Sequence, residues 1–323
     1  MQIIRYDREM RQAWDAAVDA ARNGTFLFHR SYMDYHSDRF EDLSLLMADR
    51  HGRIMALLPA SRSGEDEVVS HGGLTYGGLI ATPDATLARV GEMYGEACSY
   101  YARLGFARLV VKPVPHIYAA APCEEELYWL NRLGGKLTAR SASQTIDLGN
   151  AEMHFSTLRR RKVRRARACG WRMEEGWAQL SCFWPILTEV LRLRHGVAPV
   201  HTMAEMQRLA MDNAPHIRLY TAWRDEVCLA GTVVYECGHV AHAQYISGSK
   251  EGRETGALDA LFDELTAAYR KRGFRYFDFG ISTEQGGSVL NEGLTFQKEG
   301  FGARTICYDA YTLNLSSAGC QEA

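Results

Sequence analysis

Apolar residues recur with the period of an α-helix between residues 258 and 269. They occupy positions i, i+3, i+4, i+7 and i+11 of one helical stripe, at Leu258, Leu261, Phe262, Leu265 and Tyr269. Two basic residues and then Gly273 follow, which is a typical helix end. Residues 240–246 and 276–279 flank this segment and have strand composition. The pattern predicts a strand, a turn, a helix and a second strand.

The rest of the chain alternates between the same two patterns. Helical spacing is found at residues 8–21, 87–104 and 122–133, and strand-like runs at 43–48, 54–58, 109–111 and 138–148. Residues 68–80 are also strand-like but contain four glycines. This mixture predicts the α/β class, with helices packed on mixed sheets.

The two halves of the chain repeat these patterns in the same order. Residues 43–54 align with 217–228, and the helix end at 101–106 aligns with 269–274, at nearly the same spacing. Several matches in one order favour tandem copies of one α/β fold. We therefore expect an N-terminal domain over residues 1–150 and a C-terminal domain over residues 151–323.

A strongly basic segment lies between the two copies. Seven of the nine residues 159–167 are Arg or Lys. One interpretation is a site for a phosphate-rich donor, a nucleotide-linked substrate or RNA. The other is a solvated linker helix whose charges are balanced by acidic neighbours.

Composition excludes several broad classes. The formal net charge of −2 favours neither DNA nor an anionic membrane as a partner. We find no apolar run long enough to span a membrane and no signal peptide, so we expect a cytoplasmic protein with no integral membrane segment. The eight cysteines form no C-x-x-C pair, which favours reduced thiols and no structural metal. His239 and His242 fall on opposite faces of a predicted strand, and we interpret them as packing or surface residues.

The turn after residues 240–246 is a candidate anion site. A strand that leads through a glycine-bearing turn into a helix directs free backbone N–H groups and the helix dipole at one point. The residues expected to line this turn are Gly252, Arg253, Thr255, Gly256 and Ala257. They form either a pyrophosphate cradle or an ordinary strand-to-helix turn.

The same turn resembles the acyl-donor motif Q/R-x-x-G-x-G/A of the GNAT N-acyltransferase superfamily. Arg253 and Gly256 meet the motif, and Leu258 departs from it. Together with the repeat and the basic linker, the chain resembles the Fem-type peptidoglycan aminoacyltransferases. Three further segments carry this resemblance: R-R-K-V-R-R-A at 160–166, Y-F-D-F-G at 276–280 and K-E-G-F-G at 298–302. The resemblance implies two tandem GNAT-like acyltransferase domains joined by a basic helix.

The resemblance also implies catalytic residues. The Lys of the K-x-x-F-G segment reaches the reacting carbonyl or a donor phosphate in the Fem-type pattern, and that role falls on Lys298; the alternative is a surface lysine. Tyr245, at the end of the strand before the donor turn, either protonates the leaving group or is a half-buried strand tyrosine. Asp278 lies in an apolar strand, where a carboxylate needs a partner or a functional role. It either accepts a proton from the amine or orders the following loop.

The acceptor amine is expected against the first copy, which holds most of the acceptor in Fem-type proteins. The candidates come from one glycine-rich and one proline-rich loop: Thr75, Tyr76, Lys112, His116 and Tyr118. We expect a small polar amine or cell-envelope precursor as acceptor, and acyl-CoA or acetyl-CoA as donor. Aminoacyl-tRNA is the alternative donor, less favoured because the chain is not basic overall and has no coiled-coil arm. A third hypothesis is a degenerate double-GNAT protein that only binds a ligand.

Overall fold

The computed structural model describes residues 1–315 except 151 and 153, so Cys320 lies outside the described residues. The chain divides into two compact units. Unit 1 comprises Met1–Ala142, Thr283–Val289 and Cys307–Ala323, and unit 2 comprises Ser143–Ser282 and Leu290–Ile306. The chain therefore returns to unit 1 twice after leaving it. The expected division at residue 150 has no such returns.

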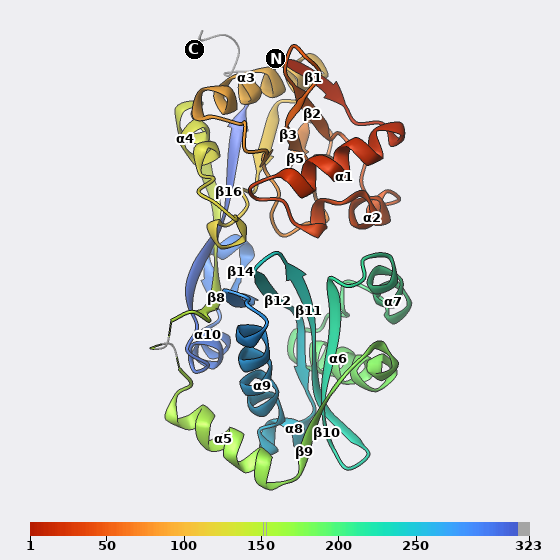
Figure 1. The fold of residues 1–323 in the computed structure, drawn as a ribbon, viewed down its shortest axis with the longest axis vertical. Coiled ribbons are helices and arrows are strands. Elements are labelled where there is room, and N and C mark those ends of the chain that lie inside the picture. The colour runs from red at the N-terminus through yellow and green to blue at the C-terminus, as the bar shows by residue number, and fades with distance from the viewer. Residues whose placement is uncertain (151, 153, 316–323) are drawn as a thin grey trace. The chain divides into compact units, whose positions relative to one another are not determined.

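Unit 1 combines two groups of strands with helices (Figure 1). One sheet is antiparallel and orders its strands as β1 (Gln2–Arg5), β2 (Leu45–Ala48), β3 (Ile54–Leu58) and β6 (Ile80–Ala81). The other strands are β4 (Ser61–Ser63), β5 (Glu67–Val69), β7 (Arg108–Val111), and the unit 1 parts of β16 (Arg304–Asn314) and β8 (Lys136–Asp147). Unit 1 also contains α1 (Arg11–Ala20), α2 (Arg30–Met33), α3 (Leu87–Arg103), α4 (Glu125–Arg132) and β14 (Thr283–Glu284), and β15 (Val289–Leu290) lies at its boundary with unit 2.

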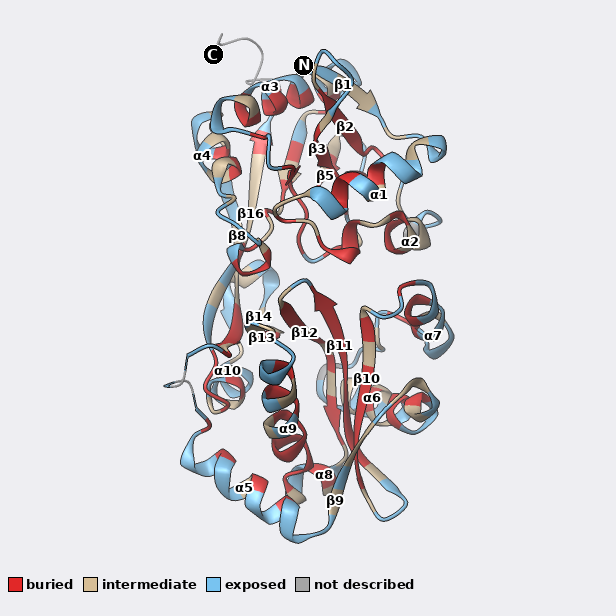
Figure 2. Ribbon diagram, viewed as in Figure 1, coloured by how far each residue is buried: buried red, intermediate tan, exposed pale blue. Residues whose placement is uncertain are grey.

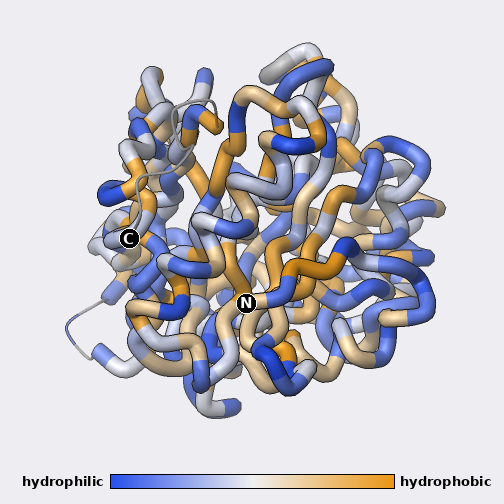
Figure 3. Tube along the Cα trace, turned by 90° about the horizontal axis from the view of Figure 1, so that it is seen from above, coloured by the Kyte–Doolittle hydropathy of each residue, from blue (hydrophilic) through white to orange (hydrophobic). Residues whose placement is uncertain are grey.

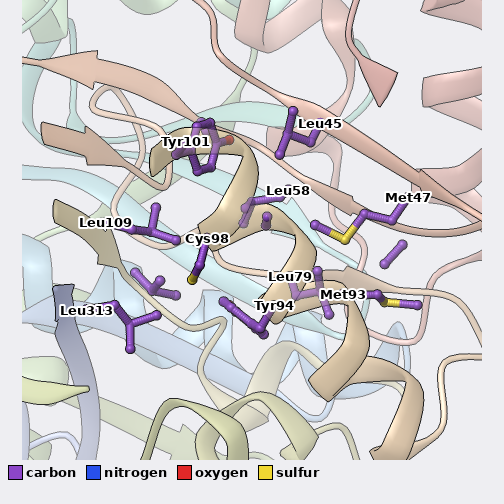
Figure 4. Close-up of a cluster of buried hydrophobic side chains, with 14 of the residues drawn as sticks. Leu45, Met47, Leu58, Leu79, Met93, Tyr94, Cys98, Tyr101, Leu109 and Leu313 are labelled. Atoms are coloured by element: carbon purple, nitrogen blue, oxygen red, sulfur yellow. The ribbon is translucent and has the colours of Figure 1, made fainter. Parts of the chain in front are cut away.

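The unit 1 core shows why the segment at the end of the chain belongs here. Leu313 of β16 pairs with Leu109 of β7, and both side chains are fully buried beside Tyr101 of α3. Figure 4 shows this cluster. Figure 3 shows that hydrophobic stretches of the trace alternate with hydrophilic ones, which include many of the outer turns. Residues 68–80, expected to be strand-like, are mostly loop between β5 and β6.

Unit 2 is an α/β unit built on one mixed sheet. Its strands are the unit 2 part of β8, then β13 (Tyr276–Ile281), β12 (Val240–Gly248), β11 (Val227–Cys237), β10 (Ile217–Arg224) and β9 (Trp171–Glu175) in spatial order. The pair β12–β13 is parallel and its neighbours are antiparallel. Its helices are α5 (Thr157–Ala168), α6 (Leu180–His195), α7 (Met203–Asp212), α8 (Lys250–Thr255), α9 (Ala257–Lys271) and α10 (Glu292–Glu299).

The expected amphipathic helix is α9. The whole predicted apolar stripe is buried in the unit 2 core. The chain turns at Gly273 (φ +86°), and α3 of unit 1 ends in the same way at Gly105 (φ +89°). Phe274 N bonds to Tyr269 O as Phe106 N bonds to Tyr101 O, so the repeat that the sequence shows at these positions is a repeat of backbone geometry.

One local expectation is wrong. Lys250–Thr255 is a helix, α8, where a turn is expected, because the Ser249 side chain caps it by accepting from Gly252 N. Lys298 lies in the last turn of α10, before Gly300.

Candidate functional site

The parallel strands β12 and β13 separate partway along their length. Their pairing covers three residue pairs and ends at His242 and Asp278. Strand β12 continues along β11 to Gly248, with an irregularity that leaves Gln244 outside the ladder. A bulge of this kind increases local bending and twist. The chain thereby opens a space between β12 and the elements that follow β13.

A pocket of about 370 Å³ occupies this space within unit 2. Its polar lining residues include five cations and one acid: Arg159, Lys162, Arg194, Arg253, Lys298 and Asp259. The acid is bound within the protein, since Asp259 Oδ1 accepts from Arg159 Nη1 at 2.9 Å. Apolar side chains, among them Ile246, Phe279 and Leu294, line the remainder. The pocket therefore suits an anionic ligand that also carries an apolar arm.

Lys298 is an internal lysine at this pocket. Its side chain is 5% exposed, and its ammonium donates to Gly280 O at 2.7 Å and to Ile281 O at 2.8 Å. Burial lowers the pKa of Lys298 from 10.5 to about 8, and the Asp278 carboxylate opposes this shift. An ammonium has three N–H donors, so one more is available in addition to the two that hold the carbonyls.

Asp278 is the centre of a buried hydrogen-bond network. Its Oδ1 accepts from Ser143 Oγ at 2.6 Å and from Thr145 Oγ1 at 2.7 Å, and its Oδ2 lies 2.7 Å from His242 Nδ1. Burial raises the pKa of Asp278, but the hydrogen bonds from His242, Ser143 and Thr145 outweigh it and hold the pKa well below its ordinary value. The carboxylate is therefore ionised and accepts the Nδ1–H of His242.

Tyr245 is oriented by a second histidine. Its hydroxyl lies 2.6 Å from His201 Nδ1, and its ring packs edge-on against Trp184 of α6. Tyr245 and His242 pair with Val233 and Tyr235 of β11, two residues apart, so both side chains lie on the same face of the sheet.

The donor-turn residues have different surroundings. Arg253 lines the pocket, and its Nη1 donates to Gly248 O at 2.6 Å. A Cβ on Gly252 would lie 2.2 Å from Leu229 O, and one on Gly256 would lie 2.7 Å from Lys162 O. Both glycines thus allow backbones to pack closely. Thr255 donates to Glu251 O, and Ala257 is buried. Phosphate binding by these residues stays a prediction.

The acceptor candidates all belong to unit 1. Lys112 donates to His71 O at 2.9 Å and to Leu74 O, and burial lowers its pKa from 10.5 to about 8. Tyr76 and Tyr118 are buried with their rings 4.6 Å apart. Thr75 and His116 are exposed. Contact of these residues with an acceptor stays a prediction.

Two histidines of this site do not follow from the sequence pattern. The strand periodicity favours a packing or surface role for His242, whereas the structure places it on the Asp278 carboxylate. The sequence does contain one indication of this contact. The predicted strand-helix-strand unit makes its two strands parallel neighbours, and this pairing brings His242 and Asp278 into register. His201 lies before α7, with no motif around it.

The described part of the chain offers neither a metal centre nor a membrane span. Among the described residues, no group of three His, Cys, Asp or Glu side chains is placed to hold a metal ion. Within the same part of the chain, none of the helices has both the length and the apolar character to cross a bilayer.

Comparison with known proteins gives a family match over most of the segment that lines this pocket. Residues 156–286 match the family model described as an acetyltransferase (GNAT) domain. No curated protein matches the chain.

Solved structures share the fold over nearly the whole chain. The crystal structure of FemX aligns with a TM-score of 0.70 at 12% identity, over 97% of each chain. L-PGS from Bacillus licheniformis aligns with a TM-score of 0.62 at 14% identity, over 95% of this chain and 92% of that one. A tandem GNAT protein from the clavulanic acid biosynthesis pathway aligns with a TM-score of 0.53 at 11% identity, over 99% of each. The fold is that of tandem GNAT proteins, as expected from the sequence.

Proposed function

We propose that this acyltransferase transfers an acyl group from acyl-CoA to an amine, in keeping with the match of residues 156–286 to a GNAT acetyltransferase domain. The observation that carries the proposal is the pocket where β12 and β13 separate, which has cationic side chains and a buried lysine. Amine attack on an activated carbonyl needs orientation and oxyanion stabilisation more than covalent help.

The pocket residues fit an acyl-CoA donor. Lys162, Arg194 and Arg253 supply positive charge for phosphates. Leu191, Ile246 and other apolar side chains suit the acyl and pantetheine portion. The volume of about 370 Å³ lies in the range of small-molecule sites.

Lys298 is the proposed oxyanion donor. Its two bonds to Gly280 O and Ile281 O fix the ammonium, so its third N–H is pre-oriented for an acyl carbonyl oxygen in the pocket. Tyr245, held by His201, is the proposed proton donor to the leaving thiolate. Removing one oxyanion donor typically lowers kcat by about 10²- to 10³-fold.

The first test separates donor binding from chemistry. Arg253→Glu should raise the donor KM, and the Kd of CoA measured by calorimetry, about tenfold or more, because it reverses a charge at the pocket. Arg208→Glu on α7, where Arg208 lies outside the pocket lining, is the matched control and should leave CoA affinity unchanged. Equal affinities for the Arg253→Glu and wild-type proteins would remove Arg253 from the donor site.

The second test concerns catalysis by Lys298. Lys298→Met should leave CoA affinity within about threefold while lowering kcat with acetyl-CoA by about 10²-fold. The measurement is thiol release with ethanolamine as a surrogate acceptor. If CoA binds but neither wild type nor variant turns over with any amine, the degenerate ligand-binding hypothesis is the better account.

Aminoacyl-tRNA is the second candidate donor, and α5 is the observation that favours it. Five arginines of this helix are exposed: Arg160, Arg161, Arg164, Arg165 and Arg167. Figure 2 shows α5 largely exposed, with its buried residues on one side. A polyanion bound here would lose affinity steeply as salt rises, whereas CoA would lose less. Replacing Arg161, Arg164 and Arg165 with Ser should abolish tRNA binding if tRNA is the donor and leave CoA binding unchanged if it is not.

For the acceptor we propose a small polar amine or cell-envelope precursor, with Thr75, Tyr76, Lys112, His116 and Tyr118 as its binding residues. Acyl-CoA and aminoacyl-tRNA are both cytoplasmic molecules, so we propose a cytoplasmic protein, in keeping with its seven free cysteines among the described residues. Mass spectrometry of the purified protein for a bound CoA species or nucleotide is the direct check of the donor.

A further inference from the structure

We propose that His242 is the proton acceptor for the attacking amine and that Asp278 is its positioning residue. This inference rests on the proposed acyl transfer. It is carried by the place of the pair in the fold: His242 and Asp278 are the last paired residues before β12 and β13 separate. The next two residues of β12, Ala243 and Gln244, line the pocket proposed for the donor.

The hydrogen bonds to Asp278 fix the state of the imidazole. Both oxygens of this fully buried carboxylate are engaged, Oδ1 by Ser143 and Thr145 and Oδ2 by His242 Nδ1. The carboxylate is ionised, so Nδ1 carries the hydrogen of the neutral ring. The lone pair then lies on Nε2, the nitrogen that a base uses. The His242 side chain is 15% exposed.

Gly280 connects the histidine to the lysine. A Cβ on Gly280 would lie 3.4 Å from His242 Cε1, and Gly280 O accepts from Lys298 Nζ at 2.7 Å. The base and the oxyanion donor therefore flank one residue. Titratable groups on the neighbouring elements include Asp278 on β13, which holds Nδ1, Lys298 on α10, which bonds to Gly280 O, and Tyr235 on β11, which pairs with His242.

In the proposed step, His242, Lys298 and Tyr245 each have one role, and the protons balance. An amine that arrives as an ammonium gives one proton to His242 Nε2, from which it passes to solvent. The neutral nitrogen then forms the C–N bond as the C–S bond breaks, while Lys298 donates to the carbonyl oxygen. The second proton of the nitrogen moves to sulfur through the Tyr245 hydroxyl. The products are an amide, the CoA thiol and one proton.

Two surrogate nucleophiles test this assignment. Ethanolamine is protonated near neutral pH and needs a base, whereas hydroxylamine is already neutral. With acetyl-CoA as donor, His242→Gln should lower kcat/KM for ethanolamine about 10²-fold and for hydroxylamine less than about tenfold. The deficit with ethanolamine should shrink as pH rises, because solvent then supplies the neutral amine. His239→Gln, a histidine just before β12 that packs on Tyr276, is the matched control and should change neither rate.

A chemical probe tests the imidazole without turnover. Diethyl pyrocarbonate should modify His242, and peptide mass spectrometry should map the adduct to that residue. Asp278→Asn, which removes the negative charge that holds Nδ1–H, should slow the modification about tenfold. Saturating CoA should slow it as well.

The outcomes separate this inference from the proposed function. A wild-type protein that binds no CoA contradicts the proposed donor, and His242 unreactive toward the probe overturns the inference independently. If turnover occurs and His242→Gln lowers the rates of both nucleophiles equally, His242 is structural and the inference is overturned.

Discussion

At the scale of single residues, Lys112 of unit 1 and Lys298 of unit 2 bind the backbone in the same way. Lys298 donates to the backbone carbonyls of the last two residues of β13, and Lys112 donates to two carbonyls of the loop that follows β5. Burial lowers the pKa of both from 10.5 to about 8. These contacts cost free energy in the folded state, because burial disfavours the charged form of each lysine.

This cost predicts a pH dependence of stability. Between pH 8 and 10.5 the unfolded chain binds more protons at Lys298 than the folded chain does, so the unfolding free energy rises with pH in this window. The variant Lys298→Met should lack that rise. Across the window, the unfolding free energy of the wild type should therefore increase by up to about 3 kcal/mol relative to that of the variant. Urea unfolding at pH 7.5 and pH 10 measures it.

The exposed Lys271 supplies the control for this prediction. Lys271→Met should unfold with the same pH dependence as the wild type. A Lys298→Met curve that also parallels the wild type would mean that the ammonium is solvated in the folded protein, which would contradict its placement as a buried oxyanion donor.

At the scale of elements, the junction of α8, α9 and α5 depends on Gly256. This residue has a φ of +85° and sits against the backbone of α5 at Lys162. Helix α5 is further held on α9 by the buried pair Arg159–Asp259, and Arg159 also lies over the Phe301 ring at 4.7 Å. Arg167 also donates to Asp263 of α9 at 2.7 Å. The basic helix is thus anchored by a buried and an exposed arginine, and the other four arginines point their charge to the surface.

Two glycines of nearly equal φ separate backbone strain from packing. Gly256→Ala must place a methyl group 2.7 Å from Lys162 O, whereas Gly273→Ala (φ +86°) meets nothing within 4 Å. Both variants incur the strain of a positive φ, but only Gly256→Ala must also displace α5. We expect thermal or urea unfolding to show Gly256→Ala less stable than Gly273→Ala by more than about 1 kcal/mol. Equal losses would show that α5 moves without cost.

The elements also show what the sequence can predict. Helix α9 and strands β12 and β13 follow from apolar patterning and from their end signals, because these are local properties of the chain. Helix α5 follows instead from the resemblance, which implies a basic helix between the two copies. Helix α8 does not follow from them, because its start depends on one Ser249 cap in a stretch rich in turn residues. The pairing of His201 with Tyr245 joins segments 44 residues apart, and no local pattern predicts it.

At the scale of the whole molecule, the tandem repeat predicts two copies of one fold but not how the chain is shared between them. The repeat compares segments in order and therefore favours a single boundary near residue 150. The structure instead assigns Cys307–Ala323 to unit 1. Strand β16 completes that unit, since Tyr311, Thr312 and Leu313 pair with β7. A strand contributed from the far end of the chain is a long-range feature that periodicity does not contain.

This sharing predicts where a mutation near the end of the chain acts. Leu313 is fully buried in the unit 1 core, as Figure 4 shows, and Phe277 is fully buried in the unit 2 core. Each truncation to Ala leaves a cavity that costs about 2–5 kcal/mol.

Leu313→Ala should therefore speed hydrogen exchange in α3 of unit 1, although 210 residues separate it from Arg103 at the end of that helix. Phe277→Ala should speed exchange in α9 instead. Mass spectrometry of the two helices in both variants gives a crossed comparison. Faster exchange in α9 but not in α3 for Leu313→Ala would place β16 in unit 2, and would restore the simple division into an N-terminal and a C-terminal half.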